Sequence, residues 1–538
     1  MKCIKKYLVL ILALVMMGSA LTACGSKSEE SKPAADEKTD NTQAQPAQTD
    51  AGANQTAEAQ EPVTIKIFGS FWPAERTEVT DYFIEQMELA TNTKIELEVP
   101  PQANYAEKLQ LMLVSGEYPD VVNFPDFSDK LFVQGVQDGL FVPINEYLDQ
   151  TPNIKEHTYE DAFDAVRVMN DENIYMIPRT SIARNDGFCV RADWLEKSGI
   201  TPAEDRSLSK DEFVELLKFF TEGDPDGNGK KDTYGMVPVA SATGYLEPVL
   251  LGAFDLLGWQ KTDSGYMNPY YDKNNENLEA ALNYSADLWT SGYIHPDWPV
   301  VKGYDFAEKF YAGEVGLIPA FAGYNYSTEE KLKEVNPDAA CTYISGVRDD
   351  DDVLHGATQV PGIWGGWAIT KECEHPEKVM EIFDWMLSDE GWKIIMYGKP
   401  GLNYEEKDGK IIPKQDDKSV VDAKTNSWCS IFMRRSTAPE FYTSTMALDA
   451  DRQAEVEGWI KIAMDSVVFS QDFGKKPDIS NDAAFIEAEN KRQEVMTKVL
   501  LGSADYADYQ KEMENWYTKG GQEYIDQMNE YINLRNGD

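Results

Sequence analysis

The chain has 538 residues, of which 93 are acidic and 50 are basic, so its formal net charge at pH 7 is −43. A surface this negative repels phosphate backbones and anionic headgroups, which excludes nucleic acid and anionic lipid as partners. Hydrophobic residues make up 42% of the chain, and its length is sufficient for two or more domains.

The N-terminal segment has the pattern of an export signal. Three lysines among the first six residues precede an apolar run over residues 7–17, which is too short for a predicted membrane span. The tetrapeptide Leu-Thr-Ala-Cys at 21–24 then resembles a bacterial lipobox. The resemblance implies that residues 1–23 are a lipoprotein signal peptide and that Cys24 is acylated, which anchors the chain to the outer face of the bacterial cytoplasmic membrane. The alternative is an ordinary secretory signal with an incidental cysteine.

Residues 25–61 contain no aromatic residue and no Leu, Ile, Val or Met. Such a segment cannot bury enough apolar surface to offset its chain entropy, so it is predicted to be a disordered linker between Cys24 and a globular body.

The body begins with strand and helix patterns in alternation. Residues 63–69, 95–99 and 120–124 are predicted strands, and the segments between them have helical spacing. The first predicted helix places five apolar residues roughly on one face: Val79, Tyr82, Phe83, Met87 and Leu89. This alternation predicts an α/β fold.

Two further helices are predicted from local signals. Ser209 and Glu212 form a capping box, which opens a helix whose apolar face is Phe213, Leu216, Leu217 and Phe220. The same spacing recurs at Val379, Ile382, Phe383 and Met386. Residues 483–534 are predicted to be helical, broken into two pieces at Gly520 and Gly521.

Seven segments, in order, resemble the extracellular solute-binding proteins of family 1, particularly the large lipoprotein branch associated with oligosaccharide import. They are residues 116–121, 139–144, 175–178, 190–195, 310–316 and 366–369, and the helix through Trp385 that ends at 389–391. The resemblance implies a two-lobe, type II periplasmic-binding-protein-like fold, with the ligand in a cleft and hinge crossings between the lobes. The implied N-terminal lobe is 62–183 with 320–372, and the implied C-terminal lobe is 184–319 with 373–538, with crossings near 179–186 and Pro319. It also implies a monomer that delivers its ligand to ABC transporter permease subunits.

Residues 224–232 match the first part of an EF-hand calcium loop. Oxygen side chains occupy positions 1, 3, 5 and 9, and position 7 would contribute its backbone carbonyl: Asp224, Asp226, Asn228, Asp232 and Lys230. Gly229 at position 6 permits the sharp turn, while Gly235 stands at position 12, where a bidentate Glu is expected. The pattern predicts a structural Ca²⁺ site with one ligand missing; the alternative is a solvated loop without metal.

Aromatic residues near glycines are the candidate ligand-binding residues, because sugar rings pack their C–H faces on aromatic planes while polar side chains bond the hydroxyls. The predicted ligand-binding residues are Trp72, Tyr245, Trp364, Trp367 and Trp428, with the polar residues Arg184, Asn185 and Asp186 at the first crossing. For any single tryptophan the alternative is core packing, and for the polar residues it is a surface loop.

Catalytic signatures are absent from the sequence, which contains no GxSxG, P-loop, GxGxxG or HExxH motif. The sequence therefore predicts a receptor for an oligosaccharide and not an enzyme. A peptide receptor and a surface glycoside hydrolase remain as alternatives. The pairing of Cys189, Cys341, Cys373 and Cys429 is left open, since four cysteines allow three connectivities.

Overall fold

The computed structural model describes residues 61–70, 76–169, 171–182, 186–238, 248–301, 305–356, 362–408, 410–414, 432–438, 440–443 and 450–536. Two sheets organise these residues, each with its own hydrophobic core, and we call the two bodies the first and the second lobe. The predicted α/β class is confirmed. No helix among the described residues is long and apolar enough to span a bilayer.

The first lobe is built on a five-stranded sheet in the order β2-β1-β3-β11-β4. The strands are β1 Val63–Phe68, β2 Thr93–Glu98, β3 Val121–Phe124, β4 Ile177–Thr180 and β11 Ile363–Ile369. Strand β1 is parallel to β2 and β3, and β11 is antiparallel to β3 and β4. All four residues of β3 are buried, as expected of a central strand covered on both faces.

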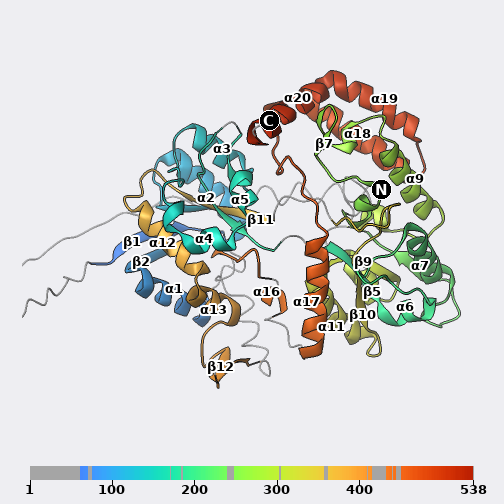
Figure 1. Ribbon diagram of the computed structural model, residues 1–538, viewed down its shortest axis with the longest axis horizontal. Coiled ribbons are helices and arrows are strands. Elements are labelled where there is room, and N and C mark those ends of the chain that lie inside the picture. The colour runs from blue at the N-terminus through green and yellow to red at the C-terminus, as the bar shows by residue number, and fades with distance from the viewer. Residues whose placement is uncertain are drawn as a thin grey trace, which may run out of the picture. The chain divides into compact units, whose positions relative to one another are not determined.

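Helices from two distant parts of the chain share the core of the first lobe. The helices are α1 Glu78–Thr91, α2 Gln102–Ser115, α3 Lys130–Gln137, α4 Pro152–His157, α5 Glu160–Val166, α12 Pro376–Leu387 and α13 Asp389–Tyr397. Figure 1 shows α12 and α13 beside α1, almost 300 residues earlier in sequence. A small hairpin, β12 Tyr404–Lys407 with β13 Lys410–Pro413, follows α13.

The apolar face predicted for α1 is correct except at one position. Val79, Phe83 and Met87 are fully buried at i, i+4 and i+8, whereas Leu89 is 72% exposed. Two helical positions after Met87 correspond to a turn of about 200°, which directs Leu89 to the opposite side of the helix.

The second lobe is built on a four-stranded sheet in the order β10-β5-β9-β6. Its strands are β5 Asp186–Arg191, β6 Tyr234–Met236, β9 Val315–Phe321 and β10 Cys341–Ile344. Its helices are α6 Ala192–Ser198, α7 Lys210–Glu222, α8 Pro248–Leu251, α9 Glu276–Thr290, α10 Asp305–Tyr311 and α11 Asn325–Val335, and β7 Gln260–Thr262 pairs with β8 Gly265–Met267.

Both helices predicted from local signals are confirmed. Ser209 caps α7, with its Oγ accepting from the Glu212 N–H at 3.2 Å and the Glu212 carboxylate accepting from the Ser209 N–H at 2.8 Å. The four apolar residues predicted for the buried face of α7, and the four predicted for α12, are all fully buried.

The division of the chain between lobes differs from the sequence prediction. Pro319 does not mark a crossing, because it lies inside β9 of the second sheet, and β10 follows in the same sheet. The chain reaches the first sheet again only at β11. The resemblance places residues 373–538 in the C-terminal lobe, but α12, α13 and Phe432 belong to the core of the first lobe. The segments resembling the family contain no information on which strand pairs with which, so these boundaries could not be read from them.

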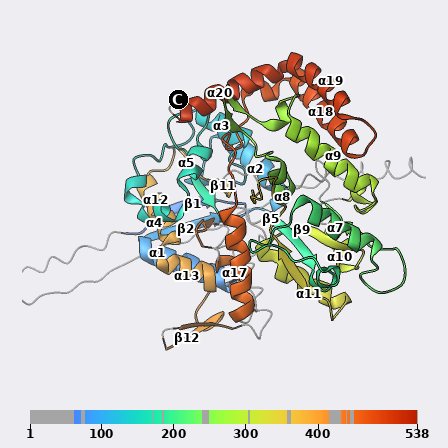
Figure 2. The same cartoon turned by 45° about the vertical axis from the view of Figure 1, so that its right-hand side comes forward.

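The C-terminal part returns to the second lobe. It consists of α16 Glu440–Thr443, α17 Ala450–Asp465, α18 Ala483–Leu500, α19 Tyr506–Trp516 and α20 Gln522–Asn536. A π-helical turn at Tyr517–Gly521 separates α19 from α20, as the two glycines predict, but residues 501–505 add a second break that was not predicted. Figure 2 shows α18 beside α19 and beside α9, and α18 packs on both of these helices.

Candidate ligand-binding site

One edge of the first sheet carries both the start of β11, next to Trp364, and the start of the first crossing between the lobes. Strands β1, β3 and β4 run in the same direction, so their carboxyl ends at Phe68, Phe124 and Thr180 lie at the same edge. Strand β11 runs the opposite way and therefore begins at this edge. In open α/β sheets, ligands bind outside the carboxyl ends of the strands.

Trp364 is directed to the surface at this edge by an irregularity in β11. The register of β11 against β4 shifts between Ile363 and Gly366, which is a β-bulge. Gly365 has a φ of +76°, and a Cβ atom there would lie 1.9 Å from the Phe124 carbonyl oxygen, so only glycine fits. A bulge re-aims the neighbouring side chain, and Trp364 is 53% exposed.

Trp367 lies in the core, and its prediction as a ligand-binding residue is corrected. Its side chain is fully buried, stacks on Phe432 with ring centroids 5.3 Å apart, and packs against Phe383 at 5.4 Å. Its indole N–H donates to the Phe432 carbonyl at 2.9 Å. The only polar atom of the side chain is thus satisfied inside the protein, as expected of a buried tryptophan.

The first crossing between the lobes leaves the first sheet at the same edge. The Ser181 N–H donates to the Gly362 carbonyl at 2.7 Å, which holds the departing chain beside the start of β11. Asp186, the third polar residue predicted there, is the first residue of β5. The other predicted residues at Trp72, Arg184, Asn185, Tyr245 and Trp428, and Cys24, which is predicted to be acylated, lie outside the described residues.

Asp186 is tied to the second lobe through its backbone. The Tyr343 hydroxyl donates to the Asp186 carbonyl at 2.7 Å, across the β5–β10 pair. Burial, and next the nearby Asp186 charge, raise the pKa of Tyr343 well above its ordinary value, so this phenol remains a proton donor. The hydrogen bond fixes the point at which the crossing segment enters β5.

One exposed segment at this edge is not among the ligand-binding residues predicted from the sequence. Pro125 and Asp126 directly follow β3, and the Asp126 carboxylate accepts from the Ser128 backbone N–H and hydroxyl, each at 2.8 Å. The available signal was the short apolar strand that precedes them, because the carboxyl end of a buried parallel strand is a common ligand position.

The loop at 224–232 brings together the side chains predicted to bind calcium. The Asn228 amide nitrogen lies between two carboxylates, 2.6 Å from Asp226 Oδ2 and 3.1 Å from Asp232 Oδ1. The Gly229 N–H donates to Asp224 Oδ2 at 3.1 Å, across the turn that its φ of +76° makes possible.

These residues fit a calcium ion by the chemistry of their donors. The amide group of Asn228 occupies the position between carboxylates that a cation would take, and all four side chains carry oxygen, the donor that Ca²⁺ requires. The loop lies between the end of α7 and the start of β6, and its four oxygen-bearing residues are all exposed. An ion bound there would join a helix to a strand and would have a structural effect.

The described cysteines are free and buried: Cys189, Cys341 and Cys373. Burial raises the pKa of the Cys373 thiol to about 12, so it is protonated and unreactive at neutral pH. Cys429 lies outside the described residues.

Comparison with known proteins identifies the class of this two-lobe α/β protein. Residues 73–391 match the family described as bacterial extracellular solute-binding protein, and the chain belongs to that family. It is 22% identical over 480 residues to the polygalacturonan/rhamnogalacturonan-binding protein YtcQ of Bacillus subtilis, an alignment that covers 84% of this chain and 88% of YtcQ.

Two solved structures show the same fold. One is a solute-binding protein from Bifidobacterium longum infantis associated with an HMO-binding ABC transporter, with a TM-score of 0.65 and 15% identity over 88% of this chain and 99% of that one. The other is an EF-hand mutant of the Streptococcus pneumoniae ABC-transporter substrate-binding protein FusA in complex with fructo-nystose, with a TM-score of 0.60 and 16% identity over 88% and 99% of the two chains.

Proposed function

We propose that this protein captures an oligosaccharide in a cleft between its lobes and delivers it to the permease subunits of an ABC importer. The observation that carries the proposal is Trp364, an exposed indole placed by a bulge at the sheet edge where the first crossing begins. An exposed aromatic plane of this kind suits the apolar face of a sugar ring. Trp72, Arg184, Asn185, Tyr245 and Trp428 are proposed to complete the site, with Asp186 where the crossing enters β5.

Membership in the family supports this function, as do the ligands named for its relatives. YtcQ is named for polygalacturonan and rhamnogalacturonan, and the FusA structure contains fructo-nystose. These proteins bind carbohydrate, and a binding role requires no catalytic constellation. We therefore infer that this chain binds its ligand without turning it over.

Calcium is proposed to occupy the loop at 224–232. The converging donors support this, and so does the EF-hand named for FusA. The ligands would be the side chains of Asp224, Asp226, Asn228 and Asp232 with the backbone carbonyl of Lys230. The ion would stabilise the second lobe without contacting the oligosaccharide.

The protein is further proposed to be a monomer held at the outer face of the cytoplasmic membrane by acylated Cys24. The lipobox-like tetrapeptide and the apolar-free linker at 25–61 support this location. A flexible linker would let the lobes reach a permease in the same membrane.

A melting-temperature screen of the full chain in detergent tests the proposed function. The panel contains fructo-oligosaccharides, galacturonan fragments and short peptides, each at several concentrations. A ligand that binds only the folded state raises the melting temperature in proportion to the logarithm of its concentration. Stabilisation by an oligosaccharide, without loss of the sugar on prolonged incubation, supports the proposal. Stabilisation by peptides alone would assign a peptide receptor, and hydrolysis of the sugar would assign a glycoside hydrolase.

A further inference from the structure

A cluster of three metal-ligating side chains lies in the second lobe, apart from the loop at 224–232. Asp255, Asp349 and His355 each place one donor atom within 4.8 Å of the other two. Asp255 caps the 3-10 turn η2 Gly252–Phe254, with a φ of 54°, whereas Asp349 and His355 belong to the segment that follows β10. Two segments almost 100 residues apart in sequence thus converge on one point.

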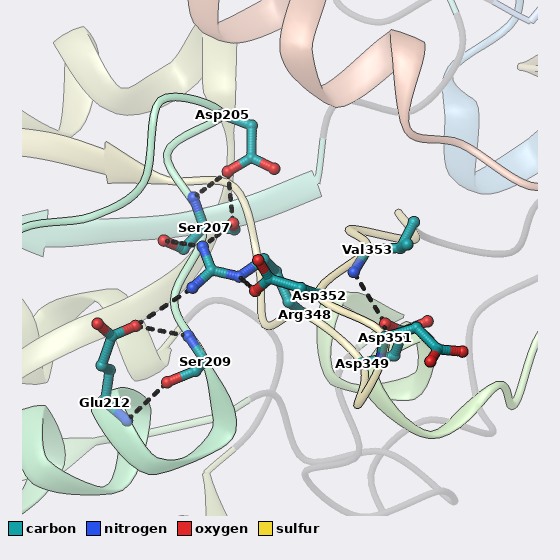
Figure 3. A network of polar contacts seen from close by, with 9 residues as sticks. All are labelled: Asp205, Ser207, Ser209, Glu212, Arg348, Asp349, Asp351, Asp352 and Val353. Carbon is teal, nitrogen blue, oxygen red and sulfur yellow. Dashed lines mark hydrogen bonds and ion pairs between the residues drawn. The ribbon is translucent and has the colours of Figure 1, made fainter.

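The carboxylate of Asp349 is held in place by the backbone around it. Asp349 Oδ1 accepts from the N–H groups of Asp351 at 3.0 Å and Val353 at 2.8 Å, as Figure 3 shows. Its other oxygen, Oδ2, lies 3.2 Å from His355 Nε2. Hydrogen bonds that orient a ligating carboxylate are the outer-shell support that metal sites use.

The segment that carries Asp349 is fixed to α7 by Arg348. The Arg348 guanidinium lies 2.6 Å from an Asp352 oxygen and 3.5 Å from a Glu212 oxygen, and donates to Ser207 Oγ at 2.9 Å (Figure 3). Lys210 lies 2.8 Å from Asp350. Arg348 and Lys210 are thus paired with Asp352 and Asp350, and Asp349 is paired with the imidazole of His355.

The segment that carries His355 is pressed against η2. A Cβ atom on Gly252 would lie 2.0 Å from the His355 carbonyl oxygen, so the two segments meet backbone to backbone. The next residue, Gly356, donates its N–H to the Ser466 carbonyl at 2.7 Å. The backbone that carries His355 is therefore held in place by η2 on one side and by Ser466 on the other.

The donor set identifies the class of ion. Calcium takes oxygen ligands almost entirely, whereas an imidazole nitrogen with two carboxylates suits a divalent transition metal such as zinc. With ligand bonds of about 2.0–2.2 Å and tetrahedral geometry, two donors on one zinc ion lie about 3.4 Å apart. Asp349 Oδ2 and His355 Nε2 already lie 3.2 Å apart, and all three donor atoms lie within 4.8 Å of one another. Asp255 is exposed, so water can fill the remaining coordination positions.

We propose that Asp255, Asp349 and His355 bind one divalent transition-metal ion, with zinc as the best match. The ion joins η2 to the segment that leads from β10 toward β11, at the place where the chain leaves the second lobe. It is chemically distinct from the oxygen-only site at 224–232 and does not depend on the proposed oligosaccharide function.

Zinc binding to the full chain in detergent tests the proposal. The protein is first treated with a chelator, then saturated with calcium to fill the loop at 224–232, and titrated with zinc against a chromophoric chelator. The expected result is one tightly bound zinc ion per chain. Asp255→Asn and His355→Ala should each weaken zinc binding by more than the ~10- to 100-fold that loss of an outer-shell partner costs. Asparagine tolerates the left-handed backbone at position 255, so the first variant keeps the fold.

His375→Ala is the matched control, since His375 is a half-exposed histidine in the first lobe whose Nδ1 lies 3.3 Å from Glu377 Oε1. It should bind zinc as the unmodified protein does. Asp224→Asn with Asp226→Asn should also leave zinc binding unchanged. The proposal is wrong if the unmodified chain binds no zinc under these conditions. It is equally wrong if zinc affinity is the same in Asp255→Asn and His355→Ala as in the His375→Ala control.

Discussion

Trp364 and Trp367 are three residues apart on the same strand, yet one is half exposed and the other is completely buried. Side chains alternate between the two faces of a strand, so residues three apart already tend to point to opposite faces. The bulge at Gly365, with its φ of +76° and its close approach to the Phe124 carbonyl, additionally interrupts the pairing of β11 next to Trp364. Composition cannot distinguish the two tryptophans, because both flank the same pair of glycines. The pairing of β11 with β3 and β4 decides which indole reaches solvent, and both of those strands are distant from β11 in sequence.

Replacement of these tryptophans should separate binding from folding. Trp364→Ala should weaken oligosaccharide binding about five- to a hundredfold, from a loss of about 1–3 kcal/mol for one stacking platform, with little change in melting temperature. Trp367→Ala should instead lower the free energy of unfolding by about 3–5 kcal/mol through loss of core packing. Affinity by titration and stability by urea unfolding are measured on the same preparations. Equal affinity in Trp364→Ala and the unmodified protein would remove Trp364 from the site.

Lys475 is a buried amine that joins the C-terminal part of the chain to the first lobe. Its Nζ donates to the carbonyls of Ala165 and Arg167, at the end of α5, and lies 5.3 Å from the centroid of the Phe127 ring. Burial lowers the pKa of Lys475 from 10.5 to about 7, and the nearby Asp126 only partly opposes this. The charged form is therefore the less favourable one in the folded protein.

Protein stability should consequently depend on pH through Lys475. Between about pH 7 and 10.5 the native protein has released this proton while the unfolded chain retains it, so the free energy of unfolding rises with pH across this window. The slope is at most about 1.4 kcal/mol per pH unit, and below pH 7 the cost of the buried charge is present in full. The measurement is urea unfolding between pH 6 and 9 of the unmodified protein and of Lys475→Met. The stability difference between the two should shift in favour of the lysine protein as the pH rises, and a difference independent of pH would contradict the assignment.

At the scale of elements, the sequence predictions are right where a feature depends on residues close together in sequence. They are wrong where it depends on pairing with distant residues. The capping box of α7 and the convergence of side chains at 224–232 depend on residues within about ten positions, and both are found as expected. Membership of β9 in the second sheet depends on pairing with β5, more than 100 residues away. No apolar pattern within β9 carries that information, and the expected crossing at Pro319 is wrong for this reason.

Calcium should stabilise the α7–β6 connection through the loop at 224–232. Melting temperature should rise with calcium and fall with a calcium chelator, because an ion that binds only the folded loop shifts the unfolding equilibrium. Asp224→Ala combined with Asp226→Ala should abolish this difference, since it removes two of the four side-chain oxygen ligands. Ser209→Ala, at the other end of α7, is the matched control: it should cost about 1 kcal/mol by loss of the cap and keep the full response to calcium. Insensitivity of the unmodified protein to both calcium and chelator would exclude the site.

At the scale of the whole molecule, the chain passes between the two sheets more than once. It leaves the first sheet after β4, returns at β11, and leaves the first core again between Ala438 and α17, which packs against the second lobe. Each lobe is therefore built from segments far apart in sequence, and neither could be excised as a continuous fragment. The two-lobe α/β class was predictable from the alternation of elements and the family resemblance, whereas the division of segments was not.

The location of this two-lobe body in the cell should depend on one atom, the Cys24 sulfur. Cys24→Ala should either release the protein from the membrane fraction or leave it there as the uncleaved precursor, because the acyl chains and the cleavage both require the cysteine. A net charge of −43 over the full sequence provides no attraction to anionic lipid, so release is expected when the acyl chains are lost. Fractionation with electrophoretic sizing distinguishes the two expected outcomes. Cys3→Ala, which changes the other cysteine of the N-terminal segment, should leave both location and size unchanged. A Cys24→Ala protein that stays in the membrane fraction at the mature size would show that residues 21–24 are not a lipobox.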